Sequence, residues 1–153
     1  MTMNMNRRQA LAFSAGAAAA AIIGLPFGAA LAAAEDTDKR IMDFTGGKTP
    51  ATGKITLTAP EIAENGNTVP ISVSVESAMT DGDMVQSVMI LAEGNPNPEV
   101  ATFNFTALSG TAAATTRMRL AKTQNVIAVA KMADGSVFMD KKEVKVTIGG
   151  CGG

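Results

Sequence analysis

The sequence has no histidine, tryptophan or tyrosine and only one cysteine among its 153 residues. Without histidine there is no Ser-His-Asp triad, no imidazole proton shuttle and no histidine-ligated metal. A single cysteine excludes an intramolecular disulfide, a Cys-x-x-Cys redox pair, a Cys-x-x-Cys-His haem site and a multi-cysteine zinc site. Most familiar catalytic sets are therefore ruled out, and we expect neither a cofactor nor a bound metal.

Acidic side chains are absent from residues 1–34, although the rest of the chain has 14. This segment opens with a basic patch ending in Arg7 and Arg8 and continues as an apolar, alanine-rich stretch whose end is made of small residues. That layout is typical of an export signal. We predict a signal peptide over residues 1–34, cleaved after Ala32 or Ala34, and the alternative is a retained membrane anchor.

The adjacent arginines indicate an export route. The stretch Asn6-Arg7-Arg8-Gln9-Ala10-Leu11 resembles twin-arginine signals, which send folded proteins across the bacterial inner membrane. We therefore expect a periplasmic protein that has no membrane contact after cleavage. Without the two arginines the mature charge is 11 − 14 = −3. With no basic run and no stacking aromatics, a nucleic-acid partner is not expected.

One domain is predicted over residues 35–148, and it begins with a short helix at residues 35–45. Acidic residues near the start of this helix suit its dipole, and Gly46-Gly47 suits its C-terminal cap. About ten residues are marginal as an isolated helix, so this one must pack on the domain. The expected contacts are Ile41, Met42 and Phe44.

After Pro50 the sequence alternates between apolar and polar residues, as half-buried strands do. Two runs, residues 88–92 and 126–130, are continuously apolar and are predicted to be central strands. Turn-forming residues separate the segments. Seven or eight short strands predict an all-β fold, an immunoglobulin-like antiparallel β-sandwich. The alternating segments are residues 55–58, 71–76, 101–106, 117–120 and 144–148.

Methionines and aspartates offer candidate metal ligands. A methionine cluster could bind Cu(I), but these methionines are scattered over strand positions, so core or interface packing is the favoured interpretation. Asp81 and Asp83, with Asp134 or Asp140, lack the longer run of oxygen ligands that Ca²⁺ needs, so they are interpreted as turn residues. The methionines outside the signal are Met42, Met79, Met84, Met89, Met118, Met132 and Met139.

A group of lysines lies near the end of the domain, at Lys141, Lys142 and Lys145. Lysines in this pattern indicate an exposed strand edge that charge protects from pairing with other chains. A docking site for a partner is the alternative interpretation.

The tail from Gly149 to Gly153 surrounds Cys151 with glycines alone. Glycine has no side chain to bury and the widest backbone freedom. With the last strand ending at Ile148, Cys151 lies three residues beyond the domain, a reach of about 10 Å. We predict a flexible arm over residues 149–153. A stray cysteine is the weaker interpretation, because an unpaired thiol in an oxidising compartment invites dimerisation and over-oxidation.

The thiolate of Cys151 is a soft nucleophile that forms reversible bonds to sulfur. No lysine, arginine or histidine stands beside it in the sequence to activate it. This favours a passive carrier whose chemistry is done inside partner enzymes, where a slim arm can enter a narrow channel.

These features together resemble the SoxY family, the sulfur-carrier subunits of bacterial thiosulfate-oxidising Sox systems. The resemblance spans the chain and rests on the twin-arginine signal, residues 58–66, residues 94–98 and above all the glycine-rich tail. It implies that Cys151 holds the substrate covalently. It also implies a swinging arm made of Gly149, Gly150, Gly152 and Gly153.

The resemblance further implies a heterodimer with a SoxZ-like subunit. The thiosulfate-derived cargo would be attached by a c-type cytochrome ligase and processed by a sulfate-releasing hydrolase and a sulfane dehydrogenase, while this chain is not itself an enzyme. A different class of function is a structural immunoglobulin-like exported domain in which Cys151 forms an interchain disulfide. A thiol-dependent enzyme acting alone is disfavoured, because no general base stands near the nucleophile in the sequence.

Overall fold

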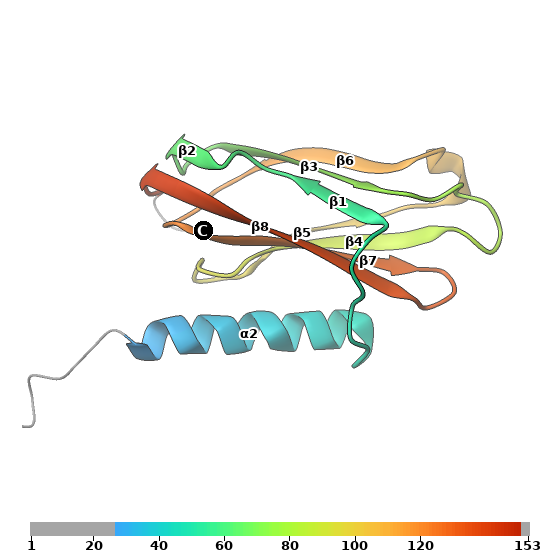
Figure 1. Cartoon of the computed structure of the whole chain (residues 1–153), viewed down its shortest axis with the longest axis horizontal. Coiled ribbons are helices and arrows are strands. Elements are labelled where there is room, and N and C mark those ends of the chain that lie inside the picture. The colour runs from blue at the N-terminus through green and yellow to red at the C-terminus, as the bar shows by residue number, and fades with distance from the viewer. Residues whose placement is uncertain (1–26, 151–153) are drawn as a thin grey trace, which may run out of the picture.

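The computed structural model of the chain describes residues 27–150, and the side chains of residues 35–150. Two sheets face each other and one helix lies along the larger sheet (Figure 1). The smaller sheet has the strand order β1-β3-β6, and the larger has the order β2-β8-β7-β4-β5. The all-β, immunoglobulin-like sandwich with a short N-terminal helix is thus confirmed. The elements are α2 (Phe27–Thr45), β1 (Ile55–Thr58), β2 (Ile62–Asn65), β3 (Val69–Val75), β4 (Val85–Ala92), β5 (Glu99–Asn104), a 3-10 turn (Ala107–Ser109), β6 (Ala112–Met118), β7 (Gln124–Met132) and β8 (Val137–Ile148).

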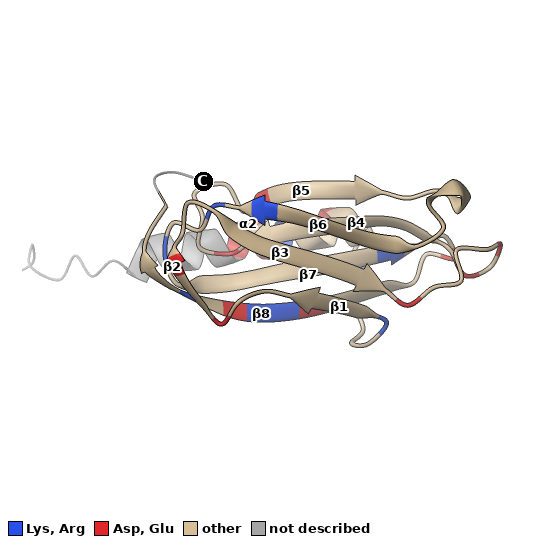
Figure 2. Ribbon diagram, turned by 90° about the horizontal axis from the view of Figure 1, so that it is seen from above, with Lys and Arg blue, Asp and Glu red and all other residues tan. Residues whose placement is uncertain are grey.

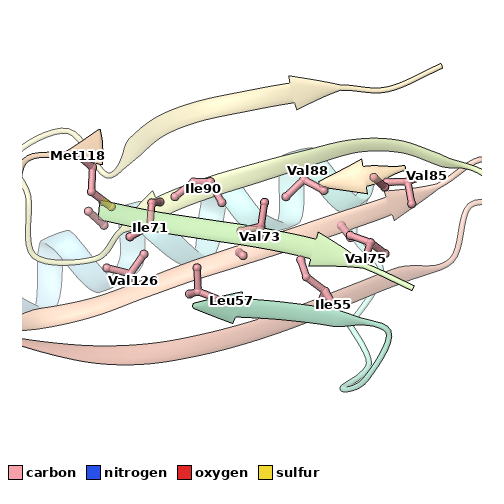
Figure 3. Packing of buried hydrophobic residues seen from close by; sticks show 14 of the residues in the cluster. Ile55, Leu57, Ile71, Val73, Val75, Val85, Val88, Ile90, Met118 and Val126 are labelled. Carbon is pink, nitrogen blue, oxygen red and sulfur yellow. The ribbon is translucent and has the colours of Figure 1, made fainter. Parts of the chain in front are cut away.

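The core between the sheets follows from the two-residue alternation of the sequence. Along β1 and β3 every second side chain points inward, and the six that do so are at most 7% exposed. Figure 3 labels five of these side chains, which point toward Val88, Ile90 and Val126 of the facing sheet. The inward residues of β1 and β3 shown there are Ile55, Leu57, Ile71, Val73 and Val75.

The outer face of the larger sheet is covered by α2, which explains the two continuously apolar runs. Strands β4 and β7 bury one set of side chains in the sandwich and the other set against the helix. Ile41 and Phe44, three residues apart on one helical face, pack on this second set. The second set consists of Met89, Leu91, Ile127 and Val129.

Two details of the helix differ from the prediction. It begins at Phe27 instead of Glu35, because the alanine-rich sequence before Glu35 has high helix propensity. Met42 was wrongly assigned to the buried face, since it is 59% exposed. The buried face consists of Thr37, Ile41, Phe44 and Thr45, which follow the helical spacing.

One strand pairing is parallel. Strand β2, which the alternation pattern did not reveal, pairs with the end of β8 so that Asn65 lies opposite Ile148. The pairings of the other strands are antiparallel. Because β2 and β8 run in the same direction, the residues that follow them, Gly66 and Gly149, leave the sheet side by side. In Figure 1 this is the end of the sandwich at the left.

Candidate functional site

The base of the predicted arm lies where β8 ends. Gly149 and Gly150 follow Ile148, whereas Cys151, Gly152 and Gly153 lie outside the described residues. Gly150 is buried, and its N–H donates to the carbonyl oxygen of Leu120 at 2.9 Å. At these two glycines, which we call the arm base, the structure differs from the freely projecting arm expected from the sequence.

The arm base lies against a backbone surface that we call the glycine socket, formed by Gly66, Leu120 and Ala121. A Cβ added to Gly149 would lie 2.3 Å from the carbonyl oxygen of Ala121, and one added to Gly150 would lie 2.8 Å from that of Gly66. A Cβ on Gly66 would lie 2.2 Å from the oxygen of Leu120 and 2.7 Å from the nitrogen of Gly150. No side chain fits at these distances, so the three glycines allow the backbones to approach.

Backbone hydrogen bonds join the three segments that meet here. The N–H of Gly66 donates to the oxygen of Ile148 at 2.7 Å, and the N–H of Leu120 donates to the oxygen of Gly66 at 2.8 Å. The bond from Gly150 to Leu120 completes the set. Leu120 connects this surface to the core, because its side chain is 0% exposed.

Asn95 holds the socket from behind. Asn95 is 4% exposed, and its side-chain Nδ2 donates to the carbonyl oxygen of Arg119 at 2.9 Å. Its Oδ1 accepts the N–H of Ala121 at 3.0 Å. One amide therefore brackets Leu120, whose own N–H and carbonyl bind Gly66 and Gly150.

A second buried amide fixes the orientation of the first. Gln124 Nε2 donates to Asn95 Oδ1 at 2.8 Å and to the oxygen of Lys122 at 3.1 Å. Gln124 Oε1 accepts the N–H of Gly94 at 2.7 Å. Satisfied buried networks of this kind hold a loop in one conformation. The sequence presented residues 94–98 only as a turn, because nothing in it indicates that Asn95 is buried.

The methionine interpretation is confirmed for most positions. Four methionines are buried at 4% exposure or less, and two more are partly buried against them, while Met42 is the exposed exception. Methionine here fills space between branched side chains. The buried ones are Met79, Met89, Met118 and Met132, and the partly buried ones are Met84 and Met139.

The aspartates organise loops and a strand. Asp83 accepts the N–H of Ala78 at 2.9 Å and Lys54 Nζ at 3.1 Å, and these two contacts, in that order, lower the pKa of its carboxyl. Asp134 accepts the hydroxyl and N–H of Ser136, which also lower its pKa. Asp140 instead accepts the N–H of Leu57 at 2.8 Å, joining the two sheets.

The lysines of β8 are exposed, as predicted, but β8 is only partly an edge. Strand β2 pairs with it from Lys145 onward, whereas Lys141 and Lys142 lie in the part that β2 leaves uncovered. Within residues 27–150, no three acidic, histidine or cysteine side chains gather as a metal site. The one helix in that range is not apolar enough to cross a membrane.

Comparisons with known proteins agree with this fold. A family model described as sulfur oxidation protein SoxY matches residues 41–151. The structure of the sulfur carrier protein SoxY from Chlorobium limicola f. thiosulfatophilum is 29% identical, with a TM-score of 0.65, covering 78% of this chain and 99% of that one. No protein among curated sequences matches the chain.

Superoxide reductases share the fold at lower identity. The one from Ignicoccus hospitalis is 21% identical with a TM-score of 0.55, covering 62% of this chain and 81% of that chain. The one from Nanoarchaeum equitans is 15% identical with a TM-score of 0.52, covering 62% and 99%. At these identities the likeness concerns architecture alone.

Proposed function

The chain belongs to the SoxY family of sulfur oxidation proteins, and on that premise we propose that it carries thiosulfate-derived sulfur covalently on Cys151. One observation carries the assignment to this residue. The family match ends on Cys151, so the only cysteine of the chain falls within it. A carrier needs one stable attachment atom and no catalytic apparatus of its own, which suits a chain that has no histidine.

Attachment forms a sulfur–sulfur bond. The thiolate of Cys151 joins the sulfane sulfur of thiosulfate, and the electron pair released passes to the c-type cytochrome ligase. Water then takes the outer sulfone group away as sulfate, with release of protons, in a reaction carried out by the hydrolase. One sulfane sulfur remains on Cys151 for the sulfane dehydrogenase to oxidise. Reversible sulfur–sulfur chemistry is the ordinary reactivity of a thiolate.

The same proposal includes a partner subunit and a location in the cell. Membership of the family supports a complex with a SoxZ-like subunit, which would leave the arm available to the other enzymes. The predicted twin-arginine signal over residues 1–34 supports export to the periplasm. Export of a folded complex would explain why a chain with no cofactor ligands carries such a signal.

The test is a pair of cysteine substitutions. We expect Cys151→Ser to reduce thiosulfate-dependent sulfate release by the reconstituted system to background while the unfolding midpoint stays unchanged. Adding Leu108→Cys to this variant gives a matched control, because Leu108 is 98% exposed in the 3-10 turn at the other end of the sandwich. Sulfate release that survives Cys151→Ser, or that Leu108→Cys restores, would contradict the proposal.

A further inference from the structure

We infer that the glycine socket and Asn95 are positioning residues for Cys151, because they hold the preceding residue, Gly150, against the sandwich. This inference rests on the proposed carrier function, since the thiol that it positions is the one used there. The arm therefore has a fixed base. Gly149 and Gly150 belong to the folded body.

Close backbone contacts distinguish the glycines of the socket and the arm base from the other glycines. Turn glycines with a positive φ have open space where a Cβ would be, as at Gly53, Gly82 and Gly110. Gly66, Gly149 and Gly150 instead have backbone atoms within 2.2 to 2.8 Å of that position. Backbone cannot move aside as the end of a flexible side chain can. The absence of side chains at these three glycines therefore allows the arm base to pack closely on the glycine socket.

A chain of hydrogen bonds links Gly150 to the buried side chains behind the socket. Gly150 bonds to Leu120, Leu120 is bracketed by Asn95, and Asn95 is oriented by Gln124. The last two side chains are 4% and 7% exposed, and every buried polar side-chain atom in the described part of the chain has a partner. A satisfied buried network costs little to keep and much to open. The position of Gly150 is therefore linked to the core through these hydrogen bonds.

A fixed base has a functional consequence for a carrier. If the arm base were loose, two more residues would have to be ordered whenever a partner enzyme bound the cargo. Fixing the backbone of each residue carries an entropic cost that weakens binding, so loosening both residues would raise the KM for loaded carrier about tenfold or more. The rate constant kcat would not change, because the reacting atoms remain the same.

Two substitutions open the socket by different means. Gly66→Ala places a methyl group against the oxygen of Leu120, and Asn95→Ala leaves the oxygen of Arg119 and the N–H of Ala121 without their side-chain partner. Gly110→Ala is the control, because it strains a position at φ 69° in a loop that does not touch the socket. If Gly66→Ala fails to fold, Asn95→Ala decides the question.

The measurements are amide hydrogen exchange at Gly150 and sulfate release from thiosulfate-loaded carrier by the hydrolase, with the mature protein in its native complex. We expect a protected Gly150 amide in the wild type. In the socket variants that protection should fall at least tenfold and KM should rise with kcat unchanged, while Gly110→Ala matches the wild type. An unprotected Gly150 amide in the wild type, or lost protection without a change in KM, would overturn the inference. Hydrogen exchange can be measured on a protein without carrier activity, so it tests this inference separately from the proposed function.

Discussion

Glycine solves two different physical problems in this chain. Gly47 has a φ of 80° and open space around it, so it lets the chain turn after α2 in a left-handed conformation. Gly66 has no positive φ to accommodate but stands against the backbone of Leu120 and Gly150. Alanine at Gly47 should therefore cost only about 1 kcal/mol, the strain of a left-handed residue. Alanine at Gly66 should cost more, because backbone has to move.

A second residue-scale prediction concerns acid stability. The folded-state pKa of Asp83 is below its ordinary value of 3.8, so its hydrogen bonds stabilise the fold above the unfolded pKa. That stabilisation is lost as the pH falls through the folded pKa and Asp83 takes up a proton. We expect Asp83→Asn to be less stable than wild type at pH 7 and the difference to shrink toward zero in acid.

Urea denaturation between neutral and strongly acidic pH measures this effect. Asp81→Asn is the charge-matched control, since it lies in the same turn without contacting Ala78 or Lys54 through any described hydrogen bond. A stability difference for Asp83→Asn that stays constant across the pH range would show that the carboxylate contacts are not the cause.

At the scale of elements, what the sequence predicts depends on whether side chains carry the packing. Strands β4 and β7 were predictable because both faces are buried, one in the sandwich and one under α2. The short β2 was missed because only Ala63 of its four residues is buried. The packing of Gly150 against the glycine socket was missed for a different reason. Backbone packs on backbone there, and a glycine-rich sequence does not distinguish a tail that packs on the domain from a tail that is free.

The packing of α2 on strands β4 and β7 can be tested by substitution. Phe44→Ala should destabilise the domain by about 2 kcal/mol, because a partly buried aromatic ring leaves the cluster on the outer face of β4 and β7. Met42→Ala is the control on the same helix, and its 59% exposed side chain should contribute less than about 0.5 kcal/mol. Urea unfolding curves give both values. Equal losses for the two variants would mean that the helix does not pack as described.

At the scale of the whole molecule, the sandwich separates its hydrophobic core from the proposed place of sulfur attachment. The core side chains fill the space between the two sheets. Charged residues lie along β8 (Figure 2). The arm base follows the end of β8, beside the end of β2. The described contacts of α2 lie at Thr37 and beyond. Cleavage of the predicted signal after Ala34 would therefore leave them in the mature protein.

Export is the prediction that belongs to the whole molecule. Replacing Arg7 and Arg8 by lysine should stop export and leave the full-length precursor inside the cell, because lysine keeps the positive charge but loses the guanidinium group that defines a twin-arginine signal. The measurement is the size and N-terminal sequence of the protein in periplasmic and cytoplasmic fractions, with a mature start near Glu35 in the wild type. A double variant that still reaches the periplasm at the wild-type level would assign export to the general secretory route.

The most direct test of the carrier function is the intact mass of the native protein from cells grown with and without thiosulfate. We expect adducts under thiosulfate whose added mass is that of sulfane sulfur or of a thiosulfonate group. These adducts should map to Cys151, disappear on reduction and be absent from Cys151→Ser. A protein that shows only a free thiol or a disulfide-linked dimer during thiosulfate oxidation would contradict it and favour a structural role for the cysteine.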